Sequence, residues 1–212
     1  MTTRLIRTIA AAGLIGISAL SLSGMAHAEV YGDPQGMAGW TVEQSYDDCA
    51  IMAAADAIGQ MTGVQPDEEE IVAFARNAPS VSRPGDMIYD MSDGDDDPNG
   101  GTIFEDLPIV LGHYGVHGKY LDGAGLSALE QVLSSDGAVI VNLNSESIWD
   151  IDGDRSIPDH AVVVTGVDTD AGIVHLNDSG TGDGADEQVP IEVFEAAWLT
   201  SGHDMVITLD VA

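Results

Sequence analysis

Residues 40–63 read WTVEQSYDDCAIMAAADAIGQMTG and contain Cys49, the only cysteine of the chain. The polar residues before Cys49 give way to a run of alanine, isoleucine and methionine. Because this run is apolar on almost every side, it predicts a helix from Cys49 to Met61 that is buried at the centre of a domain. The single thiol then lies at the N-terminus of the central helix.

The first 28 residues have the features of a secretory signal peptide. Arg4 and Arg7 form a positive start, an apolar stretch follows, and a small-x-small cleavage motif, AHA, ends at Ala28. Cleavage there leaves residues 29–212, a length that fits one domain. No later apolar run is long enough to span a bilayer. We therefore expect a secreted, extracellular protein that does not associate with a membrane after the signal peptide is removed; the alternative is a retained N-terminal anchor.

The chain is strongly acidic, with 36 acidic and 6 basic residues and a formal net charge of −30. Such a surface repels nucleic-acid phosphates and anionic lipids, so we expect no nucleic-acid partner and favour cationic partners. The alternative is that the charge only keeps an exported protein soluble. A single cysteine cannot form an internal disulfide, so the thiol is either buried and inert or retained for its reactivity.

The pattern of apolar residues changes near residue 136. Before it we expect helices over Cys49–Met61, from Pro66 to Ala78, from Thr102 to about His113 with a break or kink near Pro108, and from a capping box at Ser127 to about Ser135. After it we expect strands over 138–143, 161–167, 173–177 and 205–211, with one further helix over Ile191–Leu199. Helices followed by an antiparallel sheet predict an α+β domain of two lobes. A site is expected in the cleft between them.

Cys49 is a candidate nucleophile because of its position in the helix. The unpaired N–H groups and the positive end of the helix dipole favour a thiolate there. Gln44 lies five residues earlier, and its side-chain amide could join the backbone N–H of Cys49 as a pair of donors for an oxyanion. Taken alone, Cys49 is as often a small buried residue as a nucleophile.

His160 is the candidate base, and Asp178 is the candidate group that orients it. The strands AVVVTGV and IVHLN are joined by the five turn-rich residues DTDAG, which predicts an antiparallel hairpin. If Val167 pairs with Ile173, His160 and Asp178 project to the same face, opposite or diagonal to each other. Asn177 is a rival orienting residue, but the pleat directs it to the other face.

The segments QSYDDCAIMAAADAIGQMTG and DHAVVVTGVDTDAGIVHLNDSG together resemble the papain-like cysteine peptidases. The similarity is to the branch of the bacteriocin-processing, double-glycine-leader peptidase domains, in a free-standing secreted form. It implies a papain-like fold with a central helix in an N-terminal helical lobe and a C-terminal antiparallel sheet. The resemblance assigns Gln44 as oxyanion donor, Cys49 as nucleophile, His160 as general base and acid, and Asp178 as orienting residue. Ser179 follows Asp178, where that family frequently has proline.

An acidic loop, DGDDDPNGGTIFED, has partial calcium-binding character. Asp95, Asp97, Asn99 and Gly100 have the spacing of the first half of an EF-hand loop, and Asp106 stands at its closing position. The hydrophobic residue expected before the close is displaced, and flanking helices are not evident. Calcium is therefore a hypothesis beside the alternative of a solvated acidic loop. We expect no other cofactor and no resident metal.

The sequence as a whole predicts a secreted papain-like cysteine peptidase that hydrolyses peptide bonds through Cys49, His160 and Asp178, with Gln44 as oxyanion donor. Its partner would be a peptide or protein substrate, with cationic substrates favoured by the charge. Two alternatives stay open. The acyl group could pass to an amine instead of water, which would make the protein a thiol acyltransferase. The domain could also be a non-catalytic binding module on the same scaffold, perhaps dependent on calcium.

Overall fold

The computed structural model describes residues 30–91 and 101–212, and both halves of the chain supply helices and strands; the expected signal peptide lies outside these residues. The α-helices of the described part are α1 (Pro34–Met37), α2 (Cys49–Thr62), α3 (Glu68–Ala75), α4 (Leu107–His113), α5 (Leu126–Leu133), α6 (Ser145–Ile148) and α7 (Ile191–Leu199). Its 3-10 helices are η1 (Ala38–Trp40) and η2 (Phe104–Asp106). Its strands are β1 (Val30–Gly32), β2 (Tyr89–Asp90), β3 (Gly101–Thr102), β4 (Val116–Leu121), β5 (Val139–Leu143), β6 (His160–Asp168), β7 (Ile173–Asn177), β8 (Ala185–Pro190) and β9 (Met205–Val211).

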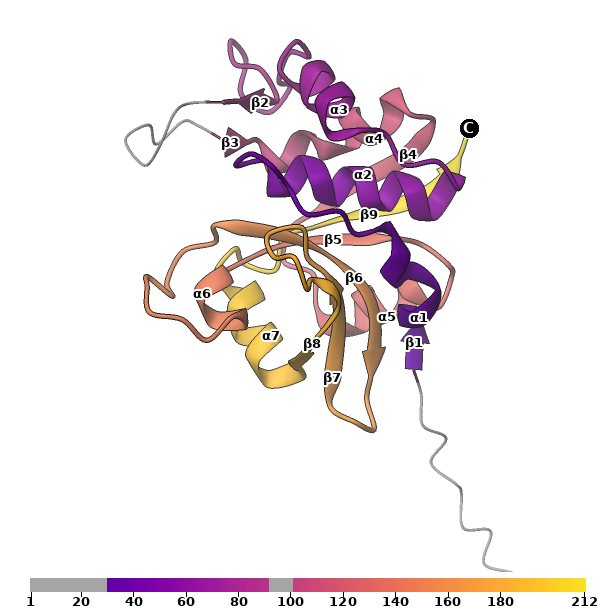
Figure 1. Ribbon diagram of the computed structural model, residues 1–212, viewed down its shortest axis with the longest axis vertical. Coiled ribbons are helices and arrows are strands. Elements are labelled where there is room, and N and C mark those ends of the chain that lie inside the picture. Colours follow the sequence, from indigo (N-terminus) through magenta and orange to yellow (C-terminus); the bar gives the residue numbers. More distant parts are fainter. Residues whose placement is uncertain (1–29, 92–100) are drawn as a thin grey trace, which may run out of the picture.

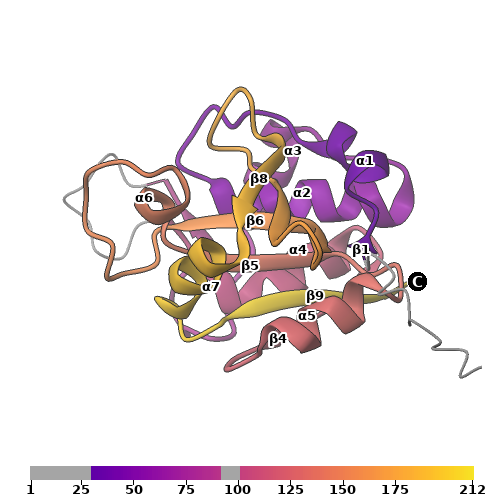
Figure 2. The same ribbon diagram turned by 90° about the horizontal axis from the view of Figure 1, so that it is seen from below.

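One antiparallel sheet holds seven of the strands, in the order β4-β9-β5-β6-β7-β8, with β1 added to β6. The long strand β6 pairs with β5 along its first half and with β1 along its last three residues. In Figure 2 the neighbours β6, β5 and β9 run next to one another across the molecule. In Figure 1, α2, α3 and α4 lie above β5 and β9, and α5, α6 and α7 lie below. The sheet is therefore covered by helices on two sides.

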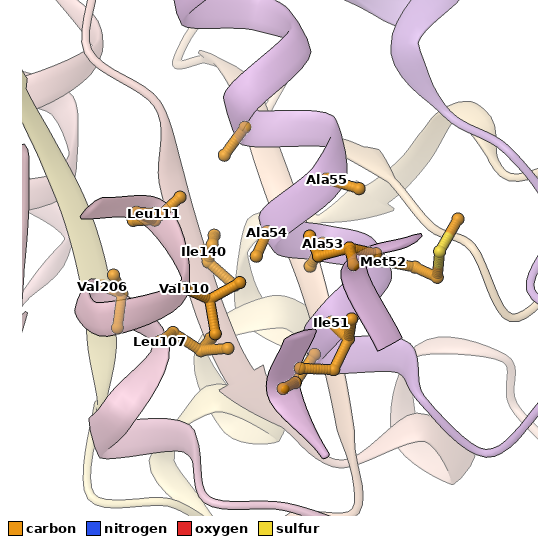
Figure 3. Close-up of a cluster of buried hydrophobic side chains, with 14 of the residues drawn as sticks. Ile51, Met52, Ala53, Ala54, Ala55, Leu107, Val110, Leu111, Ile140 and Val206 are labelled. Atoms are coloured by element: carbon orange, nitrogen blue, oxygen red, sulfur yellow. The ribbon is translucent and has the colours of Figure 1, made fainter. Parts of the chain in front are cut away.

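The central helix α2 is buried because nine of the ten residues after Cys49 have no polar side chain, so no side of this part of the helix is polar. Every residue from Ala50 to Gly59 is buried, including the charged Asp56. Its apolar side chains join those of α4 and of the strands in one cluster, and Figure 3 labels ten of these residues: Ile51, Met52, Ala53, Ala54, Ala55, Leu107, Val110, Leu111, Ile140 and Val206. The alanines allow helix and sheet to approach closely. Burial on this scale fixes the position of the residue at which α2 begins.

A second apolar cluster lies on the other face of the sheet. Val162 and Val164 of β6 belong to it, whereas Ala161 and Val163 belong to the cluster around α2. This alternation is the period of two expected of a strand covered on both faces. Phe194 and Trp198 of α7 are fully buried in the second cluster.

The predicted α+β class is confirmed, and so are the central helix and the strands corresponding to β5, β6, β7 and β9. The expected division into helices before residue 136 and strands after it is wrong, because β1 and β4 join the main sheet. The helix expected from Thr102 to about His113 is divided next to Pro108, because η2 ends at Asp106 and α4 begins at Leu107. Pro108 lies in the first turn of α4, which needs no proline N–H. The capping box at Ser127 is also wrong, because Gly125 is the N-cap of α5 and no side chain caps that helix.

Among the residues described, no helix has the length and apolar character needed to cross a bilayer.

We predict that Ile140→Ala lowers the free energy of unfolding by roughly 2–5 kcal/mol, because Ile140 is 1% exposed and truncation leaves a cavity beneath α2. Urea unfolding of residues 29–212 measures the change. Leu209→Ala is the matched control on β9, where the side chain is 59% exposed, and should change the free energy by less than about 0.5 kcal/mol. Equal losses in the two variants would contradict the burial described above.

Candidate active site

Cys49 is the first residue of α2, as the sequence predicts, and it is half-buried. Asp48 precedes it as the N-cap, and the Asp48 carbonyl accepts hydrogen bonds from the N–H groups of Ile51 (2.8 Å) and Met52 (3.0 Å). The N–H of Cys49 belongs to the first turn, where a helix supplies no acceptor of its own. Both that N–H and the positive end of the helix dipole are thus next to the thiol.

The hairpin of β6 and β7 contains one extra residue in β6. Val167 pairs with Val174, so the expected pairing of Val167 with Ile173 is wrong by one residue. The register shifts between Val164 and Gly166. A bulge of this kind opposes two residues to one and bends the strand that carries it. Beyond the bulge the strands are back in the register that the sequence predicts.

The bulge brings His160, at the start of β6, against Asp178, directly after β7. The imidazole Nε2 lies 2.7 Å from Asp178 Oδ1, and the side chains of the two residues are 6% and 0% exposed. Asp178 Oδ1 also accepts the Gly180 N–H (2.7 Å), and Oδ2 accepts the indole N–H of Trp149 (2.9 Å). A buried carboxylate needs such partners, because an uncompensated buried charge is strongly destabilising. The carboxylate is therefore fixed facing the imidazole.

The charges of the pair support each other. Burial opposes the imidazolium, but hydrogen bonds to Asp178 and to the Cys49 thiol, together with their charges, raise the pKa of His160 to about 10. Burial also opposes the ionised Asp178, but the hydrogen bond and charge of His160 outweigh it and hold the pKa of Asp178 below its usual range. Since Nε2 bonds to Asp178, Nδ1 is the nitrogen left for the thiol. A sulfur from the first half of the chain thus contacts an imidazole and carboxylate pair from the second half.

Trp149 and Gly180 complete the surroundings of His160. The sequence allows Trp149 to lie either in the wall of the cleft or in the core, and favours the core. In the structure it packs against the second apolar cluster, and its ring centroid lies 5.0 Å from that of His160. A Cβ on Gly180 would come within 3.0 Å of both His160 and Trp149. The N–H of an indole packed inside a protein usually has a hydrogen-bond acceptor, so a polar partner for Trp149 could be expected, although the sequence does not say which.

Gln44 lies close to the loop after β7, and its side chain is hydrogen-bonded to Tyr46 and Ser179. Its Nε2 donates to the Tyr46 carbonyl (2.8 Å), and its Oε1 accepts from the Ser179 hydroxyl (2.9 Å). The Gln44 N–H also donates to the Ser179 carbonyl (2.9 Å). Ser179, which stands where the resembled family often has proline, therefore orients the Gln44 amide. One N–H of that amide is not used by these bonds.

Asn177 points away from His160, as the pleat predicts. Its Nδ2 donates to Asp56 Oδ2 (2.8 Å) and to the Met37 carbonyl (2.9 Å). Asp56 is buried in α2, and burial raises its pKa to about 6 although hydrogen bonds from Asn177, Gln60 and Thr41 lower it. The bond between Asp56 and Asn177 ties the helix that begins with Cys49 to the strand that precedes Asp178.

A cleft of about 260 Å³ opens beside the thiol and the imidazole. It is lined by Asp47, Cys49, Ala50, Gly101, Thr102, Phe104, Asn142, Pro158, Asp159, His160 and Ala161. Asp47 and Asp159 make the cleft acidic. Asp159 also accepts hydrogen bonds from the Ser145 N–H (2.8 Å) and hydroxyl (2.9 Å), so its carboxylate has a fixed place in the wall.

Asp48 is a buried carboxyl that the sequence analysis did not single out. It is 1% exposed, and neither of its oxygens has a hydrogen-bond partner. Burial, followed by the nearby charge of Glu68, raises the pKa of Asp48 to about 7. Because this value lies above that of an unfolded aspartate, any stability that Asp48 contributes is complete below about pH 4 and is lost as the pH rises through 7.

The calcium hypothesis falls largely outside the described residues, since Asp95, Asp97, Asn99 and Gly100 are not among them. Asp106, expected to close the loop, is 2% exposed and accepts hydrogen bonds from the hydroxyls of Ser80 and Ser82. Its carboxylate is thus engaged in holding the segment before β2. Within residues 30–91 and 101–212, no group of three or more histidine, cysteine, aspartate or glutamate side chains is arranged to hold a metal ion.

Comparison with known proteins places this geometry in a family. The model of the Peptidase_C39 like family matches residues 40–206, a span that contains Cys49, His160 and Asp178. The chain belongs to the Peptidase_C39 like family. It is also 45% identical over 216 residues to uncharacterized proteins of Mycobacterium tuberculosis and Mycobacterium bovis, with 93% of this chain and 92% of each relative covered.

A solved structure shares the fold. The crystal structure of a Bacillus anthracis protein described as a C39-like peptidase matches with a TM-score of 0.63 at 19% sequence identity. The match covers 87% of this chain and 99% of that one. The family and the fold together suggest a cysteine peptidase-like function.

We predict that Asp178→Asn lowers the pKa of His160 by at least about one pH unit, because the variant removes the charged partner of the imidazolium. NMR titration of the His160 ring protons measures this. A raised histidine pKa stabilises the fold fully below about pH 6.5, and this contribution is lost as the pH rises through 10. The lowered pKa of Asp178 makes its own contribution complete above about pH 4 and lost at lower pH, so the stability lost in Asp178→Asn should be largest between about pH 4 and pH 6.5. An unchanged titration of His160 would show that the two side chains do not interact in solution.

Proposed function

We propose that the protein is a secreted cysteine peptidase that hydrolyses peptide bonds, with Cys49 as nucleophile, His160 as general base and acid, and Asp178 as orienting residue. The observation that carries the proposal is the shared imidazole: His160 is bonded to the buried Asp178 through Nε2 and to the Cys49 thiol on its other side. A nucleophile, a base and a group that orients the base are the parts that thiol catalysis requires. The acidic cleft beside them provides room for a substrate.

The first half of the reaction transfers an acyl group to sulfur. The thiol proton passes to His160, or His160 holds it from the start in an ion pair with the thiolate. The thiolate of Cys49 then attacks the substrate carbonyl carbon, forming a C–S bond and an oxyanion. The backbone N–H of Cys49 stabilises that oxyanion. As the C–N bond breaks, the His160 imidazolium gives its proton to the leaving amine. Asp178 stays ionised and keeps the imidazole in one orientation.

The second half releases the acyl group. His160 takes a proton from a water molecule, the resulting hydroxide attacks the thioester carbonyl, and the C–S bond breaks. The products are a carboxylic acid and the regenerated Cys49. Burial of His160 and Asp178 favours both steps, because interactions between charges are stronger where water is excluded.

Gln44 is proposed as the second oxyanion donor. The Gln44 amide oxygen accepts a hydrogen bond from Ser179, and one N–H of the same amide donates to the Tyr46 carbonyl. These two bonds orient the amide and leave its second N–H for an oxyanion. Removing one donor of this kind typically lowers kcat by about 10²–10³-fold.

The substrate and the location of the protein are part of the proposal. The signal peptide over residues 1–28 would be cleaved after Ala28 and release the domain outside the cell. Substrates with cationic side chains are favoured, because Asp47 and Asp159 line the cleft and the chain carries a net charge of −30.

We predict that residues 29–212 cleave members of a peptide library derived from a proteome, and that Cys49→Ala and His160→Ala yield no products above background. Mass spectrometry of newly formed termini measures cleavage. His175→Gln is the matched control, because His175 also contacts an aspartate, Asp186, through a 2.6 Å ring-nitrogen bond but takes no part in the cleft. This variant should retain activity within about threefold of wild type. Identical product sets from wild type and Cys49→Ala would defeat the peptidase assignment.

A further inference from the structure

Glu187 of β8 lies on the same face of the sheet as Asp178. Leu176 of β7 pairs with Glu187, and the register shifts just beyond this pair, where Asp186 has a φ of 57°. Residues two apart on a strand share a face, so Asp178 is on the face of Leu176 and diagonal to Glu187. The bulge at Asp186 therefore directs a second carboxyl group towards the one that orients His160.

The Glu187 carboxyl has little else to contact. Its Oε2 is buried and has no hydrogen-bond partner. The carboxyl groups of Glu187 and Asp178 interact directly, and two carboxyl groups that share a closed site cannot both ionise freely. Burial, followed by the charge of Asp178 and the hydrogen bond to it, raises the pKa of Glu187 to about 7, whereas the charge of His160 acts to lower it.

The Asp178 carboxylate has room for one more donor. Its Oδ1 accepts two hydrogen bonds, from His160 and Gly180, and its Oδ2 accepts one, from Trp149. A carboxylate has about four acceptor sites, so one site remains on Oδ2. A protonated Glu187 supplies an O–H group that can fill it.

We propose that Glu187 is a positioning residue of the site: as the neutral acid it donates a hydrogen bond to the Asp178 carboxylate and so fixes the carboxylate that orients His160. Loss of the Glu187 proton removes that bond and places a second negative charge beside Asp178. The site thus holds its tightest geometry at mildly acidic pH. This inference deepens the proposed function and names a residue that controls its pH dependence.

The groups that face Glu187 are few in the described part of the chain. Asp178, directly after β7, and His160 on β6 act on its charge. The helix α7 also packs against β8 and carries Glu192, which is exposed, and Glu195, which lies 3.8 Å from His203. The 3-10 helix η1, which also contacts β8, has no ionisable side chain. The proposed pH dependence therefore concerns Glu187, Asp178 and His160.

The first test is the melting temperature of Glu187→Gln, whose amide donates a hydrogen bond at every pH. A carboxyl with a raised pKa stabilises the fold below its unfolded pKa and loses this contribution as the pH rises through 7. We expect Glu187→Gln to melt within about 1 °C of wild type at pH 4.5 and at least roughly 5 °C above it at pH 8. Glu192→Gln, an exposed change of the same charge, should show no such pH-dependent gain. Equal differences from wild type at the two pH values would overturn the proposal.

The second test follows the orientation of His160 by the NMR signal of its Nε2 proton. It uses the Cys49→Ala background, so it needs no substrate and is independent of peptidase activity. With Glu187 unchanged, the signal should broaden as the pH rises above 7; with Glu187→Gln it should persist to pH 8. With Glu187→Leu, which fills the space without a donor, it should be broad at both pH 6 and pH 8. A persistent signal in Glu187→Leu would show that donation to Asp178 is not needed and would overturn the proposal.

Discussion

A carboxylate that is buried away from water needs hydrogen-bond donors to compensate its charge, and the arrangement of the site depends on how the protein provides them for Asp178. It has no exposed surface, and its donors come from the start of β6, from the segment after α6 and from its own turn. The imidazole of His160, the indole of Trp149 and the N–H of Gly180 can meet at one carboxylate only if those segments are correctly packed. The candidate site is therefore a product of the whole second apolar cluster, and any change that loosens this packing also affects the chemistry.

The position of Cys49 beside this group depends on the burial of α2. Because the helix is surrounded by apolar side chains, its position relative to the sheet is fixed, and so is Cys49 at its first turn. The bond from Asn177 to Asp56 links the same helix to β7, one residue before Asp178. Two buried contacts, one apolar and one polar, thus hold the sulfur and the carboxylate in a constant relation. The model of the Peptidase_C39 like family covers both of these contacts, since it matches residues 40–206.

The sequence could predict those parts that depend on local periodicity. The central helix and the hairpin of β6 and β7 follow from runs of apolar residues, and the shared face of His160 and Asp178 follows from the parity of their positions. The strand β4 was missed because Gly118 lies within it; a Cβ there would come within 2.6 Å of Leu111, so glycine serves the packing of α4 on β4. The edge strand β8 was missed because three of its six residues are polar and only Val189 is fully buried, so the sequence shows no run of apolar residues there. Glu187 and the bond from Trp149 to Asp178 could not be predicted, since only long-range pairing brings these residues to Asp178.

The central claim is that the Cys49 thiol and the His160 imidazole form one functional unit in the folded protein. The most direct measurement is the rate at which iodoacetamide alkylates the native protein at pH 6, which reports on one residue because the chain has one cysteine. The account predicts rapid alkylation in wild type and a rate lowered by at least about tenfold in His160→Ala. A thiol that reacts equally fast in both proteins, or only after denaturation, would contradict it.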